Sequence, residues 1–168
     1  PAYGDDNRRG KFLSHLGYFW AASDYWDIGT AFDWYTRGGW LNRTNVRYKL
    51  RYDFSGSLNA NITSLTTGEK GGRDWTEQND YNINWTHHQE INPTTRLDVN
   101  FTYMTGSYFR NFSNNLDDVL RQNVVSTATL TKTWEESNSV LSLYVYRDQN
   151  LVNGAISEQL PSISFAQG

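Results

Sequence analysis

Three observations in the 168-residue sequence predict an all-β fold, an antiparallel up-and-down transmembrane β-barrel. Residues 40–54 alternate between an aromatic or aliphatic set and a polar set that carries a row of cations, the pattern of a wall between lipid and water. No apolar run reaches the roughly 18–20 residues that a membrane helix needs. Aromatic residues make up 15% of the chain, which excludes a disordered chain. The low mean hydropathy of −0.71 is compatible with a barrel, because only alternate residues face lipid.

Composition restricts the partners and the chemistry. The net charge is −3, so nothing draws the chain toward nucleic acid. Cysteine is absent, which excludes a disulfide framework and a thiolate metal site. Residues 1–168 are long enough for one domain, and no second domain is expected. Because Pro1 is not an initiator and an alternating run continues to the last residues, we expect an internal piece of a longer chain or its only ordered part.

The alternating segments predict about eight or nine strands, seven of them near-complete. Residues 1–9 are expected as a charged turn. In the strand that follows, Phe12 is predicted on the face of Trp20, and Leu13 on the face of Phe19. The predicted strands occupy residues 10–22, 26–36, 40–54, 58–65, a stretch around 81–86, 96–105, 124–134, 139–146 and a segment that begins near 156.

The connections between these segments alternate in length. Short turns are predicted at residues 23–25, 55–57, 88–94 and 135–138, and long loops at 66–80, 106–122 and 147–154, while residues 37–39 are short where a long loop is expected. Outer-membrane barrels have short periplasmic turns and longer extracellular loops. The alternation therefore predicts a meander whose strands cross a membrane.

Charge complementarity predicts the register of one hairpin. A three-residue loop at 37–39 places Asp33 opposite Arg43 and Asp27 opposite Lys49 on the polar face. Each opposite-charge pair would stabilise the sheet by about 0.2–1 kcal/mol.

Parity assigns the remaining side chains to two environments. The cations could bind lipid phosphates or sugar carboxylates, but the favoured interpretation is lumen lining neutralised by carboxylates, because water-filled barrels carry charge inside. The predicted lumen-facing residues are Asp27, Asp33, Arg43, Asn45, Arg47, Lys49, Arg51, Asn82, Asn84, Asp98 and Asn100. The predicted interface belts are formed by Trp20, Trp26, Trp34, Trp40 and Trp134.

The sequence offers little support for catalysis or metal binding. His87 and His88 are adjacent on a strand, so they point to opposite faces and cannot share a metal ion. Ser14 and His15 also face opposite ways, and no same-face pair suggests a hydrolase. We expect neither an enzyme nor a cofactor.

Gly17 weakens or bends its strand, and Pro1 suits an edge strand or a gate.

Several motifs occur in a characteristic order: P-A-Y-G at residues 1–4, G-Y-F-W-A at 17–21, D-W-Y-T-R-G-G-W at 33–40, W-x-H at 85–87, R-L-D-V-N-F-T-Y at 96–103 and S-Y-F-R-N-F at 107–112. By these motifs the chain resembles the lipopolysaccharide (LPS)-assembly outer-membrane proteins, the LptD-like family. The resemblance covers nearly the whole chain and corresponds to the first part of the family's C-terminal barrel.

The resemblance implies a multi-pass outer-membrane protein that is part of a larger barrel of about 26 strands. Implied partners are LPS, membrane lipids, a plug lipoprotein (LptE-like), and a periplasmic LPS bridge protein that docks on an N-terminal jellyroll. LPS would leave sideways through a gate between the first and last strands, weakened by prolines. Pro1 matches the first proline, and Gly17 stands where the second is common. Residues 5–9 would form the first extracellular loop, and residues 106–122 a fourth loop that folds over the barrel.

Two alternatives stay open. One is a complete outer-membrane barrel of about eight strands that serves as an adhesin, a porin-like protein or a membrane enzyme. The other is a soluble ligand-binding barrel, in which Trp34, Tyr48 and Phe101 would be buried in a closed core.

Overall fold

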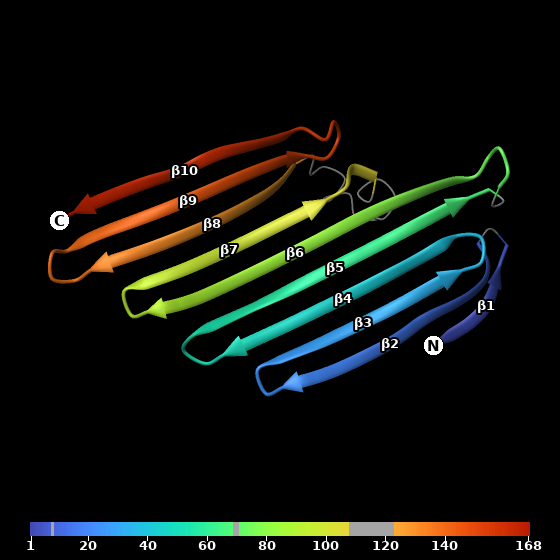
Figure 1. Ribbon diagram of the computed structural model, residues 1–168, viewed down its shortest axis with the longest axis horizontal. Helices are drawn as coiled ribbons and strands as arrows, with labels where there is room; N and C mark the ends of the chain where they lie inside the picture. The colour runs from blue at the N-terminus through green and yellow to red at the C-terminus, as the bar shows by residue number, and fades with distance from the viewer. Residues whose placement is uncertain (8, 69–70, 108–122) are drawn as a thin grey trace.

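The computed structural model describes residues 1–7, 9–68, 71–107 and 123–168 as one antiparallel sheet of ten strands. Each strand pairs with its neighbours in the chain, in the order β1 to β10, and Figure 1 shows the resulting meander. The predicted all-β up-and-down fold is confirmed. The strands are β1 (Ala2–Asp6), β2 (Gly10–Ser23), β3 (Trp26–Tyr35), β4 (Gly39–Leu50), β5 (Phe54–Thr67), β6 (Thr76–Asn92), β7 (Thr95–Met104), β8 (Asn123–Trp134), β9 (Ser139–Asn150) and β10 (Ile156–Gln167).

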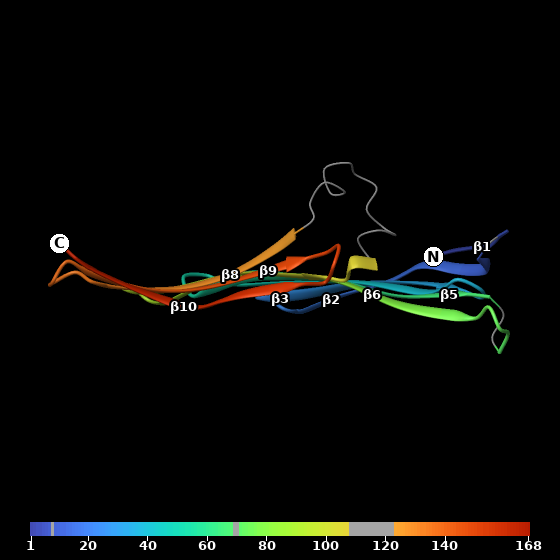
Figure 2. The same ribbon diagram turned by 90° about the horizontal axis from the view of Figure 1, so that it is seen from above.

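The sheet is a single open layer, as the edge-on view in Figure 2 shows. Leu151 is the one hydrophobic side chain that is buried among the described residues, whereas Trp34 is 48% exposed. Tyr48 and Phe101 are half-buried, so the described residues do not form the closed core that a soluble barrel requires. A sheet with one uncovered apolar face needs a lipid or protein environment on that face.

Two faces follow from the strand register. We call the face that carries Asn45, Asn59 and Asn84 the polar face, since these residues align across β4, β5 and β6. The opposite face carries Val46, Leu58 and Trp85 in one aligned row, and we call it the apolar face.

Short and long connections lie at opposite ends of the sheet, as the sequence predicted (Figure 1). Residues 24–25, 51–53, 93–94 and 135–138 connect strands at the short-turn end. Residues 68–75 and 151–155 form loops at the other end, together with the short connection 36–38. The predicted long loop 106–122 lies largely outside the described residues. β5, β6 and β9 run further than predicted, because backbone pairing continues beyond the apolar stretch, whereas β3 and β4 end before the predicted bounds of 36 and 54.

The predicted turn at residues 55–57 is wrong. These residues lie in β5, and the chain reverses at 51–53, where Asp53 N donates to Leu50 O at 3.2 Å. Tyr52 supplies the left-handed conformation of the turn, with a φ of 66°. Gly56 serves a different purpose, because Tyr48 lies across it from the neighbouring strand.

The predicted register of the β3–β4 hairpin is wrong by two residues. Asp27 lies opposite Arg47 instead of Lys49, and Asp33 lies opposite Leu41 instead of Arg43. The loop is residues 36–38, because Gly39 opens β4 with a φ of 86° rather than closing the loop. A shift of two residues keeps every side chain on its predicted face.

The N-terminal segment also differs from the prediction. Residues 2–6 pair with β2 as an edge strand instead of forming a turn, so the described residues form ten strands where about eight or nine were predicted. An irregularity at Ser14 and His15 reverses the faces of the residues before it. Phe12 therefore pairs with Tyr35 on the polar face and Leu13 with Trp34 on the apolar face, the reverse of the predicted arrangement.

Candidate functional site

Rows of amide side chains cross the middle of the polar face. Asn45 Nδ2 donates to Asn59 Oδ1 at 2.5 Å, and Asn84 Nδ2 donates to Asn82 Oδ1 at 2.9 Å. Each amide offers both donors and acceptors, so the rows can bind water or solute hydroxyls without adding net charge. The predicted residues Asn45, Asn82, Asn84 and Asn100 share this face. Asn59 and Asn61 belong to the same rows, and their alternation with Leu58, Ala60 and Ile62 could have identified them.

Two ion pairs neutralise part of the cation row between β3 and β4. Arg43 donates to Asp33 at 2.7 Å although the two are not directly opposite, because the side chain reaches diagonally along the sheet. Arg47 pairs directly with Asp27 at 3.1 Å. Asp33 is buried, with 4% of its surface exposed, whereas the Asp27 and Arg47 side chains are 26% and 63% exposed. The two pairs therefore differ in burial although they share residue types and strands.

The other two predicted cations lie in different surroundings. Lys49 lies in β4 and is exposed, near the short-turn end, opposite Ser55. Arg51 was predicted in the same strand, but it lies in the turn 51–53, with its guanidinium 4.7 Å from the centre of the Tyr52 ring. Arg51 therefore does not belong to the strand row.

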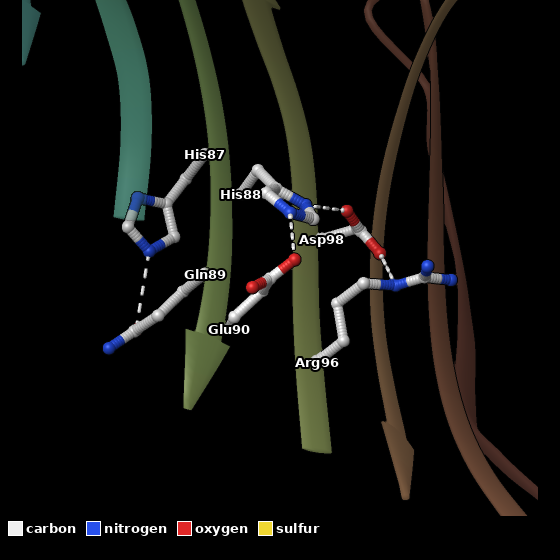
Figure 3. Close-up of polar contacts among 6 residues, drawn as sticks. All are labelled: His87, His88, Gln89, Glu90, Arg96 and Asp98. Atoms are coloured by element: carbon white, nitrogen blue, oxygen red, sulfur yellow. Dashed lines mark hydrogen bonds and ion pairs between the residues drawn. The ribbon is translucent and has the colours of Figure 1, made fainter. Parts of the chain in front are cut away.

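A histidine–carboxylate cluster joins β6 to β7 near the short-turn end, as Figure 3 shows. His88 Nδ1 donates to Asp98 Oδ1 at 2.6 Å, and Arg96 Nε donates to the other oxygen at 2.9 Å. Glu90 lies 3.9 Å from His88 Nε2. Asp98 was predicted on the polar face, but its partner His88 was not predicted, because the pairing depends on the register between β6 and β7.

His87 points to the opposite face, as predicted. Tyr48 reaches across Gly56 so that its hydroxyl donates to His87 Nδ1 at 2.8 Å and accepts from Trp85 Nε1 at 2.9 Å. His87 Nε2 lies 3.4 Å from Gln89 Oε1 (Figure 3). This order of donors fits an imidazole that carries its proton on Nε2. The network satisfies polar groups on a face that otherwise carries apolar side chains.

A shallow hollow of about 520 Å³ lies on the polar face where β2 and β3 carry small residues. Gly17, Gly29 and Ala31 contribute to its lining, together with Phe19 and the amides of Asn45, Asn59 and Asn61. A second hollow of about 250 Å³ lies beside His88 and Asp98. Both hollows are open to the polar face rather than enclosed, so they widen a surface instead of forming a catalytic pocket.

The five predicted belt tryptophans share the apolar face but lie at both ends of it. Trp20 and Trp26 contact each other edge to face at 5.6 Å, beside the turn 24–25. Trp34 and Trp40 are paired at the opposite end, next to residues 36–38. Trp134 closes β8 at the short-turn end, where Lys132 lies 5.2 Å from its ring centre. Their role as interface belts stays a prediction.

A buried carboxylate at the long-loop end was missed. Asp80 has no exposed surface and accepts hydrogen bonds from Gln78 at 2.9 Å and Thr105 at 3.3 Å, and it also contacts Ser107. Asp80 was predicted to lie in a polar loop, but β6 begins at Thr76. Asp80 thus joins the first part of β6 to Thr105 and Ser107, which follow β7.

The two gate candidates lie in or next to the first two strands. Pro1 directly precedes the edge strand β1, which pairs with β2 at only five positions. Gly17 pairs with Ala31 in a regular part of the ladder, and the register shift lies at Ser14 and His15 instead. Their assignment to a gate stays a prediction.

Within the described residues, no cluster of three or more His, Asp or Glu side chains could hold a metal ion. Among the same residues, no helix has the length and apolar character needed to cross a membrane.

No curated protein matches this chain. The protein family described as LptD protein matches all of residues 1–168. The open antiparallel sheet with one polar and one apolar face agrees with a segment of an outer-membrane β-barrel of this family. The chain therefore belongs to the LptD family of LPS-assembly proteins.

Proposed function

We propose that this chain forms an early wall of an outer-membrane translocon that inserts LPS into the outer leaflet. The family match supports a role in LPS assembly. The observation that carries the proposal further is the two-faced single layer, in which exposed tryptophans occupy one face and paired charges with amide rows occupy the other. Such a layer can face lipid on one side and a hydrated lumen on the other.

The lateral gate lies at the β1 edge in this proposal. The β1–β2 pairing extends over five positions, and the β2–β3 ladder contains two register shifts. The ladders between β3, β4, β5 and β6 have no shift. Fewer and less regular ladder hydrogen bonds make an edge easier to open, which suits a gate between this strand and the last strand of the full barrel.

The proposed partners follow from the two faces. LPS sugars and phosphates would pass along the polar face, and a plug lipoprotein (LptE-like) would occupy the lumen beside it. Membrane lipids would contact the apolar face. A periplasmic bridge protein would deliver LPS through a jellyroll outside these 168 residues. The protein acts as a non-enzymatic conduit that uses no cofactor of its own.

A closed barrel of about eight strands is the less favoured alternative. The sheet order runs from β1 to β10 without joining these two strands, so the described residues form an open layer with two edges. Unpaired sheet edges are not tolerated in lipid, and additional strands would have to cover them.

Site-specific photocrosslinking in the full-length protein in cells tests the LPS path. A photoreactive amino acid replaces Asn59 on the polar face or, as the matched control, Leu58 on the apolar face. These neighbours share a strand and a depth but face opposite environments. We expect LPS adducts at Asn59 that are lost when LPS supply from the periplasm is blocked. Any adducts at Leu58, which would face lipid already in the membrane, should persist under the same block. The absence of an adduct at Asn59 during active LPS export would refute the proposed path.

A further inference from the structure

A two-against-one irregularity interrupts the ladder between β2 and β3. Leu13 pairs with Trp34 and Leu16 with Phe32, so Ser14 and His15 together oppose the single residue Asp33. This arrangement is a β-bulge, which bends the strand and leaves a backbone group of the extra residue without its ladder partner. The bulge lies in the strand that carries the edge strand β1.

His15 adopts a conformation that side chains disfavour. Its φ is 56°, in the left-handed region, which residues other than glycine rarely adopt. Its backbone N–H points away from a regular ladder partner and needs another acceptor. Ser14 is buried, and its Oγ lies 3.2 Å from His15 Nδ1. The bulge therefore persists only where surrounding groups compensate for it.

Asp33 provides that compensation. Its Oδ1 accepts the His15 backbone N–H at 2.7 Å, and its Oδ2 accepts from Arg43 at 2.7 Å. Both carboxylate oxygens are thus used, and the side chain is buried. A charged acceptor makes the bond to the N–H stronger than a neutral one would, and Arg43 keeps the carboxylate in place.

We propose that Asp33, oriented by Arg43, is a positioning residue that fixes the β2 bulge and thereby sets the faces of the β1–β2 hairpin. The bulge shifts the alternation by one residue, so that Tyr3 and Leu13 lie on the apolar face and Phe12 on the polar face. Without it, a regular ladder would send each of these side chains to the opposite face. An ion pair on the polar face thus decides which side chains the edge hairpin presents to lipid.

The consequence for the gate rests on the proposed function. Among the described residues β1 is joined to the sheet only through β2, so the stability of the bulge sets how readily this edge frays. Asp33, which lies on β3, therefore influences how easily the gate opens. Gly17, in a regular part of the ladder, would have less influence.

Hydrogen exchange of the full-length protein, purified from outer membranes, tests the proposal. Asp33→Ala removes both contacts, whereas Asp33→Asn keeps an acceptor for His15 and loses the charge pair with Arg43. Asp27→Ala is the matched control, because it breaks the other Asp–Arg pair on the same two strands and leaves the bulge at Ser14 and His15 untouched. We expect amides of residues 10–16 to exchange about tenfold faster in Asp33→Ala, with a smaller increase in Asp33→Asn and no change in Asp27→Ala.

A labelling experiment reads the faces directly. In Tyr3→Cys protein the cysteine should react with a lipid-soluble maleimide, and adding Asp33→Asn should increase its reaction with a charged maleimide. Unchanged exchange at residues 10–16 in Asp33→Ala would overturn the proposal, as would equal acceleration in Asp27→Ala. Failure of the Asn59 crosslinks would refute the LPS path and leave these exchange results untouched, so the two proposals fail separately.

Discussion

Gly56→Ala tests whether the neighbours of Gly56 in β5 require a residue without a side chain at this position. A Cβ at this position would overlap the Tyr48 hydroxyl and would lie 2.5 Å from the Thr86 carbonyl oxygen. The tyrosine ring can withdraw, but the Thr86 backbone belongs to the β6 ladder and cannot move without loosening it. The ring would then lose its hydrogen bonds to His87 and Trp85.

The cost follows from these contacts. Two hydrogen bonds contribute about 0.5–1.5 kcal/mol each, which gives about 1–3 kcal/mol. Crowding against the fixed backbone adds about 1–3 kcal/mol. We therefore expect Gly56→Ala to lower the free energy of unfolding by about 2–6 kcal/mol. Tyr48→Phe, which removes only the hydroxyl, should cost no more than about 3 kcal/mol.

Denaturant unfolding of the full-length protein in detergent measures these changes. Gly29→Ala is the control, because a Cβ there would lie 3.8 Å from Phe19 Cδ2, an ordinary contact distance. The effect of Gly56→Ala should shrink when Tyr48→Ala removes the ring, since the two residues then no longer interfere. Equal stability of the Gly56→Ala and Gly29→Ala proteins would refute this account of the glycine.

Three further predictions concern the register, a turn and a buried carboxylate. Cysteines at positions 27 and 47 should form a disulfide on oxidation, whereas cysteines at positions 27 and 49 should not, because only the first pair is directly opposite. Gel mobility measures disulfide formation, and a shift for the 27/49 pair but not for the 27/47 pair would contradict the register. Tyr52→Val should destabilise the protein by about 1–2 kcal/mol relative to Tyr52→Asn, because β-branched residues resist the left-handed conformation that asparagine tolerates; equal denaturation midpoints would contradict this. Asp80→Ala should cost about 2–4 kcal/mol, because it removes a buried, charged acceptor to which Gln78 and Thr105 donate. A loss below about 1 kcal/mol by denaturant unfolding would mean that other interactions replace these hydrogen bonds.

Side-chain parity could be read from the sequence because a strand alternates its faces strictly. Asp27, Asp33, Arg43 and Arg47 lie on one face as predicted, even though the predicted pairing was shifted by two residues. Alternation determines only which face the odd-numbered and even-numbered residues occupy, so a register error of two residues does not change the assigned faces. Charge matching chose the wrong register because long arginine side chains also reach diagonal partners, as Arg43 does with Asp33.

Glycine was the least reliable signal. The tripeptide at residues 55–57 has the composition of a turn, yet Gly56 lies in mid-strand under the Tyr48 ring, and Tyr52 takes the left-handed turn position instead. The space that Gly56 provides is needed by a residue on another strand. No local rule reports such a requirement.

The sequence alone determined the all-β class, the two faces and the alternation of short and long connections, since these depend on side-chain periodicity and local composition. Tertiary structure decided the register, the true turns and the face reversal at Ser14 and His15, because each depends on contacts between residues far apart in the chain. Asp33 illustrates the difference. Its face was predictable, but its bond to the His15 amide exists only because β2 and β3 meet at a bulge.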